Sequence, residues 1–259
     1  MDFALVTGAS SGLGELFARK LAESGRDVVI VARRADRLEQ LRDEISVRQG
    51  VRIEAIAIDL AAQGSAQNLF DQLAGRGIAV STLINNAGYG ANGSFAAMDM
   101  AAQSRMIDLN CRTLMELCHL ALPHMIARRE GGILNVASTA AFQPGPWMSV
   151  YYATKAFVLN FSQGLHEEVK DQGVRVAALC PGPTATEFAD VASMADSRLF
   201  THFAMTPEKV VSDGLAALKS NQAVRISGAR NWIMAQSNRI APRAMVRQMV
   251  GRLQRSRQR

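Results

Sequence analysis

The chain has 259 residues, of which 48% are hydrophobic and 20% are charged, a composition that excludes a disordered chain and can fill one large buried core. No apolar run approaches the length that spans a bilayer, and the first segment lacks the basic residues of a signal peptide. Three cysteines without paired spacing indicate free thiols and a reducing, cytoplasmic compartment. The four histidines match no metal-ligand spacing, so we expect no metal site.

Charge is distributed unevenly along the chain. The 29 basic and 23 acidic residues give a net charge of +6, but no acidic residue follows Asp213. Residues 214–259 hold ten of the basic residues, so the preceding part has 19 basic against 23 acidic residues and a net charge of −4. A mildly acidic body therefore carries a basic tail. Because neither aromatic interleaving nor a nucleic-acid motif accompanies the arginines, we expect no nucleic-acid partner.

Short apolar runs alternate with segments of helical spacing over most of the chain. The predicted strands are Phe3–Thr7, Asp27–Ala32, Val51–Ile58, Thr82–Asn85, Gly132–Val136 and Val174–Leu179, and the predicted helices are Gly14–Ser24, Ala35–Gln49, Ser65–Gly75, Ala101–Arg129 and Tyr151–Gln172. This alternation predicts an α/β fold, with a parallel sheet, helices on both faces and right-handed crossovers. No repeat or linker interrupts it, so we expect one domain over 1–228 and a basic helical extension over 229–259.

The first predicted turn, from Thr7 to Gly14, is rich in glycine. Gly8 permits a tight turn, Gly12 allows the backbone to approach a pyrophosphate, and Gly14 allows the helix to pack closely on the strand. The following helix presents free N–H groups and the positive end of its dipole to the phosphates. Because these glycines lie between a strand and a helix, their spacing predicts a dinucleotide site.

The second predicted strand ends at two arginines, Arg33 and Arg34. Many NAD sites have a carboxylate here, which binds the 2′-hydroxyl of the adenosine ribose. A guanidinium instead matches the shape and charge of a phosphate, so the pair favours NADP, with the Ser10 hydroxyl as a further ligand. The alternative is a solvated basic loop that opens the next helix.

Tyr151 and Lys155 are four residues apart at the start of a predicted helix, so they share one face. A nearby ammonium favours tyrosinate, and we expect Lys155 to lower the pKa of Tyr151, which suits a proton donor and acceptor near neutral pH. Tyr152 is three residues from Lys155, so spacing alone does not choose between the tyrosines. Ser138, just after the strand that ends at Val136, is placed to donate a hydrogen bond to a substrate oxygen, although serine is also common in turns.

Together these features resemble the short-chain dehydrogenase/reductase family over at least residues 3–228. The resemblance rests on six motifs in the family's order: Thr7-Gly8-x-x-x-Gly12-x-Gly14, Asn85-Asn86-Ala87-Gly88, Asn110, Ser138, Tyr151-x-x-x-Lys155 and Pro181-Gly182-Pro183-Thr184-Ala185-Thr186. It implies a doubly wound Rossmann sheet of about seven parallel strands, with Ala223–Ser227 as the last. It also selects Tyr151 over Tyr152 and implies a catalytic tetrad of Asn110, Ser138, Tyr151 and Lys155.

By the same resemblance, the cofactor contacts extend along the carboxyl edge of the sheet. The expected cofactor-binding residues are Gly8, Ser10, Ser11, Gly12, Leu13, Gly14, Arg33, Arg34, Asp59, Leu60, Asn86, Ala87, Gly88, Tyr151, Lys155, Pro181, Gly182, Thr184 and Thr186. The implied reaction is hydride transfer between nicotinamide and a carbonyl carbon. Ser138 and Tyr151 would bind the carbonyl oxygen, Lys155 would hold the ribose, and Asn110 would anchor a water of the proton relay.

The expected substrate pocket is largely apolar, which favours a hydrophobic ketone. Its candidate lining residues are Tyr89, Ala141, Phe142, Trp147, Met148, Phe188, Met194, Leu199, Phe200 and Phe203, with Arg198 as the one candidate cation. The long loop from Glu187 to Phe203 has the length of a lid. Two alternatives stay open: a dehydrogenase that oxidises a hydroxy acid or alcohol, and a noncatalytic dinucleotide-binding, membrane-associated protein. We also expect a homo-oligomer.

The tail has two apolar stripes at helical spacing, separated by Pro242. The stripes are Trp232, Ile233, Gln236 and Ile240, then Met245, Val246, Met249, Val250 and Leu253 with Arg243, Arg247 and Arg252 beside them. This basic amphipathic pattern is typical of a helix on a membrane surface, so peripheral membrane contact is one interpretation. A helix pair packed on its own domain or on a partner subunit is the other, and we favour it.

Overall fold

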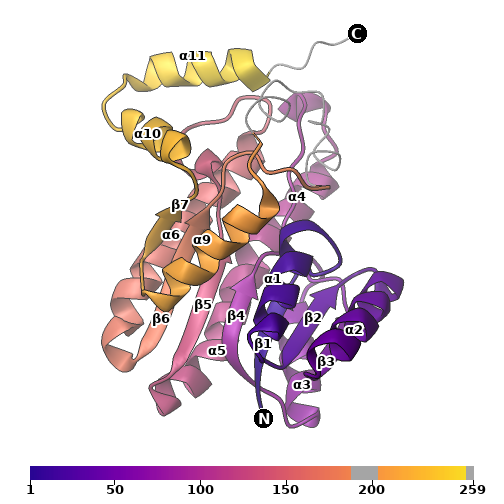
Figure 1. Cartoon of the computed structure of the whole chain (residues 1–259). Helices are drawn as coiled ribbons and strands as arrows, with labels where there is room; N and C mark the ends of the chain where they lie inside the picture. Colours follow the sequence, from indigo (N-terminus) through magenta and orange to yellow (C-terminus); the bar gives the residue numbers. More distant parts are fainter. Residues whose placement is uncertain (188–203, 255–259) are drawn as a thin grey trace.

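The computed structural model describes residues 1–187 and 204–254 (Figure 1). In these ranges seven parallel strands form one sheet in the order β3-β2-β1-β4-β5-β6-β7. The strands are β1 (Asp2–Thr7), β2 (Val28–Ala32), β3 (Ile53–Ala57), β4 (Ala79–Asn85), β5 (Gly131–Val136), β6 (Val174–Cys180) and β7 (Val224–Ile226). The strand order reverses between β1 and β4, as in a doubly wound sheet, so the predicted fold class is confirmed.

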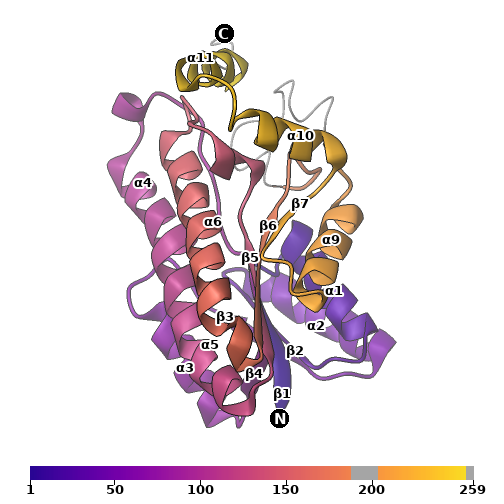
Figure 2. The same ribbon diagram turned by 90° about the vertical axis from the view of Figure 1, so that its left-hand side faces the viewer.

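Helices cover both faces of the sheet (Figure 2). One face carries α1 (Gly12–Glu23), α2 (Ala35–Gln49) and α9 (Pro207–Lys219), whose apolar sides join a single core cluster. The other carries α3 (Ser65–Gly75), α5 (Leu114–Arg128) and α6 (Ser149–Val169), which join a second cluster. The sheet therefore lies between two apolar layers, as the continuous hydrophobic strands predict.

Strand β1 shows how the sequence directs this packing. Phe3 and Leu5 join the cluster under α3, α5 and α6, whereas Ala4 and Val6 join the cluster under α1, α2 and α9. Successive side chains of a strand point to opposite faces, so an unbroken apolar run is buried on both sides. Parallel strands buried in this way end together at the carboxyl edge, where binding residues can gather.

The long helix expected over Ala101–Arg129 is wrong in detail, because it divides into three parts. Helix α4 (Met100–Ile107) leads into a π-helical segment, η2 (Asp108–Thr113), and α5 follows. The spacing of apolar residues does not distinguish a π-helical turn from an α-helical one, so the sequence did not predict this segment. Single π-helical turns within helices often lie at functional sites. Helix α9 is absent from the predicted elements. Its sequence carries a start signal, since Pro207 is the first residue of the helix.

The tail forms α10 (Ala229–Ser237) and α11 (Arg243–Gln254), which lie at the carboxyl end of the sheet (Figures 1 and 2). Val246 and Val250 are buried in a cluster that includes Tyr151 and Tyr152, as expected of a helix packed on its own domain. The second predicted stripe is nevertheless not one face. Met245, Met249 and Leu253 are exposed, because neighbouring residues lie about 100° apart around a helix. The first stripe also fails to pack, since α10 buries Asn231 and Ala235 while Trp232 and Ile233 are exposed.

The three thiols, Cys111, Cys118 and Cys180, are free, and burial raises the pKa of Cys118 and of Cys180 to about 12. Such thiols pack as apolar groups and react poorly. Over residues 1–187 and 204–254, no helix is both long and apolar enough to cross a bilayer, and no group of acidic, histidine and cysteine side chains could hold a metal ion.

Candidate active site

A cleft of about 710 Å³ runs along the carboxyl edge of the sheet. Of the expected site residues it is lined by Gly8, Ser10, Ser11, Gly12, Leu13, Arg33, Arg34, Asp59, Leu60, Asn86, Ala87, Gly88, Ser138, Tyr151, Lys155, Pro181, Gly182, Thr184 and Thr186. Asn110 and Gly14 lie behind this lining. The fold thus brings residues from five of the six motifs to one surface, as the carboxyl ends of parallel strands permit, and Asn110 lies behind it.

The glycine turn after β1 is shaped by close backbone contacts. Gly12 has a φ of +58°, and a Cβ on it would come within 3.3 Å of Thr186 across the cleft. A Cβ on Gly14 would lie 2.2 Å from the carbonyl oxygen of Gly8, so this glycine serves the packing of α1 on β1. The Asn86 side chain holds the turn from the other side, where its Nδ2 donates to the carbonyl oxygen of Thr7 at 3.0 Å. The backbone of the turn is therefore left without a Cβ at Gly12, where a pyrophosphate could approach it closely.

Arg34 is fixed at the end of β2 by contacts with the glycine turn. Its Nε lies 3.2 Å from the Ser10 hydroxyl, and its Nη2 lies 3.2 Å from the Ser10 carbonyl oxygen. The same Nη2 lies 3.2 Å from a carboxylate oxygen of Glu187. Hydrogen bonds from Ser11 and Arg34 hold the pKa of Glu187 below its usual value. The arginine was expected from the sequence, whereas this carboxylate, which directly follows the Thr186 motif, was not.

Asp59, expected beside the adenine, is also paired. Its carboxylate accepts a hydrogen bond from Arg105 of α4 at 2.6 Å and one from the backbone N–H of Ala61 at 3.1 Å. Partial burial raises the pKa of Asp59, but these two hydrogen bonds and the charge of Arg105 outweigh it and keep the pKa below its usual value. Arg105 lines the cleft and was not predicted, because only the fold brings α4 beside the end of β3.

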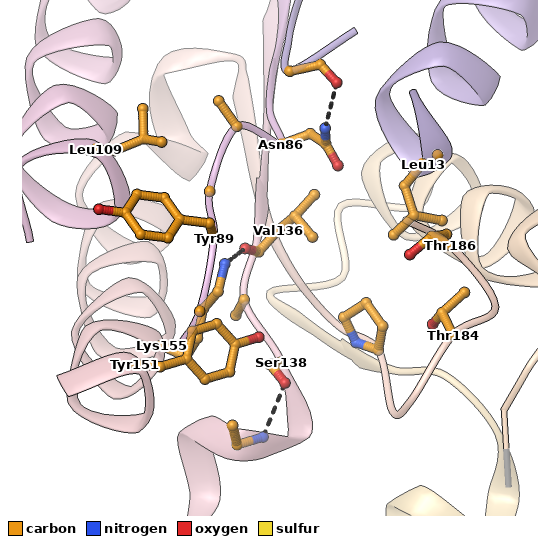
Figure 3. Close-up of a pocket in the computed structure, with 18 of the residues that line it drawn as sticks. Leu13, Asn86, Tyr89, Leu109, Val136, Ser138, Tyr151, Lys155, Thr184 and Thr186 are labelled. Carbon is orange, nitrogen blue, oxygen red and sulfur yellow. Dashed lines mark hydrogen bonds between the residues drawn. The ribbon is translucent and has the colours of Figure 1, made fainter. Parts of the chain in front are cut away.

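Ser138, Tyr151 and Lys155 converge in the middle of the cleft (Figure 3). The Ser138 hydroxyl accepts a hydrogen bond from the N–H of Ala140 at 3.0 Å and shares another with the Tyr151 side chain. Lys155 Nζ donates to the carbonyl oxygen of Val136 at 2.7 Å and lies 5.8 Å from the centre of the Tyr151 ring. Two hydroxyls therefore point at one region above the end of β5.

The expected lowering of the Tyr151 pKa is wrong for this structure. Burial raises the pKa of Tyr151, and the hydrogen bond with Ser138 opposes that rise only in part. Lys155 is itself buried, which lowers its own pKa to about 8, and its Nζ is turned toward the carbonyl oxygen of Val136. Spacing on a helix shows that two side chains share a face, but it shows neither their burial nor the direction of the ammonium.

Asn110 lies in the π-helical segment η2 and is 1% exposed. Its side-chain Nδ2 donates to the carbonyl oxygen of Tyr89 at 3.0 Å and to the Thr154 hydroxyl at 3.1 Å, while its Oδ1 accepts from the N–H of Tyr89 at 3.2 Å. A Cβ on Gly88 would lie 3.0 Å from this Oδ1. Asn110 thus joins the loop after β4 to the helix that carries Tyr151 and Lys155.

The far end of the cleft is mostly apolar and includes residues of the tail. Tyr89 and Met148 line it as expected, whereas Ala141, Phe142 and Trp147 do not. Phe188, Met194, Arg198, Leu199, Phe200 and Phe203, with most of the expected lid, lie outside the described residues. The unpredicted lining residues at this end are Ala91, Ala140, Gln143, Tyr152, Met234 and Gln254.

Gln254 connects the last turn of α11 to α6. Its Nε2 donates to the Tyr152 hydroxyl at 2.6 Å, and its carbonyl oxygen accepts from Asn92 at 3.2 Å. No sequence signal identifies this residue, because a glutamine in a basic tail has no motif and its neighbour in space is 102 residues away.

Residues 2–196 match the family model described as short chain dehydrogenase. The chain belongs to this family. Over 194 residues it is 35% identical to the very-long-chain 3-oxoacyl-CoA reductase of Bos taurus, which covers 73% of this chain and 62% of the bovine protein. Over 197 residues it is 36% identical to sulfoacetaldehyde reductase 2 of Chromohalobacter salexigens, covering 75% of this chain and 77% of that one. The chain therefore spans less than two-thirds of the bovine relative's length.

Solved structures of the family share the architecture over nearly the whole chain. A short-chain dehydrogenase from Sphingobium yanoikuyae in complex with NADPH matches with a TM-score of 0.82 and 33% identity, covering 93% of this chain and 94% of that one. The bulky-bulky ketone specific alcohol dehydrogenase of Comamonas testosteroni matches with a TM-score of 0.78 and 29% identity, covering 96% of each chain. These likenesses support a nicotinamide dinucleotide as the cofactor class.

Proposed function

We propose that this protein is an NADP(H)-dependent reductase of hydrophobic ketones. The observation that carries the cofactor assignment is the position of Arg34, which the glycine turn holds at the end of β2 beside Arg33. A dinucleotide whose pyrophosphate follows the turn would bring its adenosine ribose to this point. Two guanidiniums there favour a 2′-phosphate, and a similar structure of the family contains NADPH.

The bound cofactor would supply the hydride, and the chain's own residues would bind and protonate the carbonyl oxygen. Burial keeps the Tyr151 phenol protonated at neutral pH, so it holds a proton for the oxygen. The Ser138 hydroxyl, hydrogen-bonded to this phenol, supplies a second donor. Fixed hydrogen-bond donors of this kind each lower the activation free energy of such a reaction by about 3 kcal/mol, because they stabilise the negative charge that develops on the carbonyl oxygen.

Lys155 and Asn110 would organise the site around this pair. Lys155 Nζ, anchored to the carbonyl oxygen of Val136, would donate to the nicotinamide ribose beside the phenol. Asn110 keeps the loop after β4 and the catalytic helix in register through Tyr89 and Thr154. The role of Lys155 is the one that the family resemblance implies. For Asn110 the resemblance implies the anchoring of a water of the proton relay, and the contacts with Tyr89 and Thr154 would hold its side chain in place for that role.

The substrate assignment rests on the apolar end of the cleft, beyond Ser138. The residues there are aromatic, thioether and methyl side chains together with the amides of Gln143 and Gln254. A lining of this kind takes an apolar ketone more readily than a polyhydroxylated sugar. Two relatives act, by their names, on a very-long-chain 3-oxoacyl-CoA and on bulky ketones, which agrees with this class.

We also propose a cytoplasmic protein that forms homo-oligomers. Three unpaired thiols fit a reducing compartment. Exposed apolar side chains on the outer helices, including Met115 of α5 and Phe157 of α6, fit a contact between copies.

A substrate screen tests the proposed function. The purified chain is mixed with NADPH or NADH and with ketones of increasing apolar size, and oxidation of the reduced nicotinamide is followed by absorbance. We expect turnover with NADPH, a higher kcat/KM for larger apolar ketones, and loss of turnover in Tyr151→Phe. A clear preference for NADH, or for sugars over apolar ketones, would contradict the proposal.

A further inference from the structure

The C-terminal helices expose an unusual concentration of apolar side chains. In the described part of the chain, 14 large apolar side chains are exposed, and seven of them lie between residues 229 and 254. They are Trp232, Ile233, Met234, Ile240, Met245, Met249 and Leu253. Scattered exposed apolar residues are normal on a protein surface, but a contiguous group marks a binding surface.

Helix α11 has two apolar rows rather than one. Val246 and Val250 are buried against the rest of the domain, and their packing holds the helix in place. Met245, Met249 and Leu253 repeat at intervals of four along a different row and are 59%, 53% and 50% exposed. The second row is therefore not needed to hold the helix in place, and it is available to a partner.

Arginines accompany these apolar residues, and acidic residues do not. Arg230, Arg239, Arg243, Arg247 and Arg252 are exposed on α10, α11 and the turn between them. No aspartate or glutamate follows Asp213 anywhere in the sequence. The helices lie together at one end of the molecule, beyond the carboxyl ends of the strands (Figures 1 and 2). This end is therefore both apolar and positive, whereas the preceding part of the sequence is net negative.

We propose that this C-terminal surface, formed by the exposed residues of α10 and α11, binds an anionic phospholipid membrane. Apolar side chains flanked by arginines match the boundary between acyl chains and negative headgroups. A second copy of the chain fits less well, because two such surfaces would bring like charges together. A nucleic acid would neutralise the arginines but would leave the row of Met245, Met249 and Leu253 in water.

Membrane binding at this surface would bring the substrate end of the cleft to the lipid. Met234 of α10 and Gln254 of α11 both line the cleft, so the helices that would contact lipid also form its wall. An apolar ketone dissolved in the bilayer would then lie near the opening. This consequence, unlike the lipid contact itself, rests on the proposed reductase function.

Vesicle sedimentation tests the proposal with the full chain. The probes are vesicles of phosphatidylcholine alone and of phosphatidylcholine mixed with phosphatidylglycerol. We expect binding to the mixed vesicles that weakens as salt is added, since screening shortens the reach of surface charge. In Arg243→Gln/Arg247→Gln, binding should weaken about 25-fold, because each basic residue near an anionic surface contributes about a factor of five.

A second variant and a matched control separate the apolar contribution from general effects. Met245→Gln/Met249→Gln/Leu253→Gln should weaken binding to the mixed vesicles at least about tenfold, because three side chains lose their burial in lipid. The control, Val47→Gln/Met100→Gln, changes side chains that are 86% and 61% exposed on α2 and α4 and should bind as the unchanged chain does. None of the three variants changes a residue that lines the cleft, so each should still turn over a water-soluble ketone.

The proposal is overturned if the unchanged chain stays in solution with mixed vesicles at low salt, or if the control weakens binding as much as the triple variant does. It is also overturned if light scattering shows a dimer that the triple variant dissociates while vesicles are ignored, or if RNA binds and vesicles do not. Vesicle binding by a chain that reduces no ketone would refute the proposed function and leave the lipid contact standing.

Discussion

Replacing Tyr151 with phenylalanine removes the phenol that shares a hydrogen bond with Ser138, whereas the same change at Tyr152 removes the hydroxyl that accepts from Gln254. The two tyrosines are adjacent and equally buried, at 8% exposed each. Their rings meet edge to face, with centres 6.1 Å apart. Identical substitutions at neighbouring positions should therefore have different effects, one on the chemical step and one on stability.

For Tyr151→Phe, the lost group is the proposed proton donor. General acid catalysis contributes about 10²- to 10⁴-fold, which corresponds to about 3–5 kcal/mol of barrier. The ring and its packing remain, so the fold and the binding of NADPH should be kept. We expect kcat to fall by about 10²-fold or more while the Kd for NADPH changes little.

For Tyr152→Phe, the lost group anchors the end of α11. The Nε2 of Gln254 would keep no partner at this site, and a buried donor left unpaired costs about 1–3 kcal/mol. In a chain of this size, where Tm falls by about 2 °C per kcal/mol, that cost lowers Tm by about 2–6 °C. Because the hydroxyl is hydrogen-bonded to α11, we expect kcat to stay within about fivefold of the unchanged enzyme.

The assay compares kcat, the Kd for NADPH and Tm for the unchanged chain and both variants. Gln254→Leu is the matched control, since it removes the same hydrogen bond from the other side and should lower Tm without abolishing kcat. An inactive Tyr152→Phe beside an active Tyr151→Phe would refute the assignment of the donor. A Tyr152→Phe variant with unchanged Tm would refute the anchoring role of Gln254.

Four further predictions concern the cofactor end of the cleft and Lys155. Arg34→Ala should weaken NADPH binding about 10- to 100-fold in fluorescence titrations and leave NADH nearly unchanged, because a charge-assisted contact with phosphate is lost; equal losses would contradict the NADP assignment. Glu187→Gln should strengthen NADPH binding by up to about fivefold at low salt, since an exposed carboxylate then no longer competes for Arg34, and weaker binding would contradict this. Burial lowers the pKa of Lys155 to about 8 from a usual value near 10.5, so the unfolded chain binds this proton more tightly than the folded chain does. The contribution of Lys155 to the free energy of unfolding should therefore be constant below about pH 8 and should rise between about pH 8 and 10.5. Denaturant titrations should show that Lys155→Met lacks this rise. kcat/KM for NADPH should fall above about pH 8 as the ammonium loses its proton, and a profile that rises there would argue against a role for that charge.

The sequence determined the sheet and the order of the motifs along its edge. Apolar runs such as the one in β2, buried on both faces, have one stable location, the centre of a helix-covered parallel sheet. The glycines of the first turn, Arg34 at the end of β2 and the four-residue spacing of Tyr151 and Lys155 are local features. Each depends on residues that are close in sequence, so periodicity and turn chemistry pointed to them, although the choice of Tyr151 over Tyr152 came from the family resemblance.

The tertiary structure decided what depends on contacts between distant residues. It put Asn110 in a π-helical segment, brought Glu187 to Arg34 over 153 residues and brought Gln254 to Tyr152 over 102. It also reversed the expected shift of the Tyr151 pKa, because burial is a property of the packed fold and not of the helix that carries the tyrosine. For the same reason, the second stripe of the tail became one buried row and one exposed row only where α11 meets the domain.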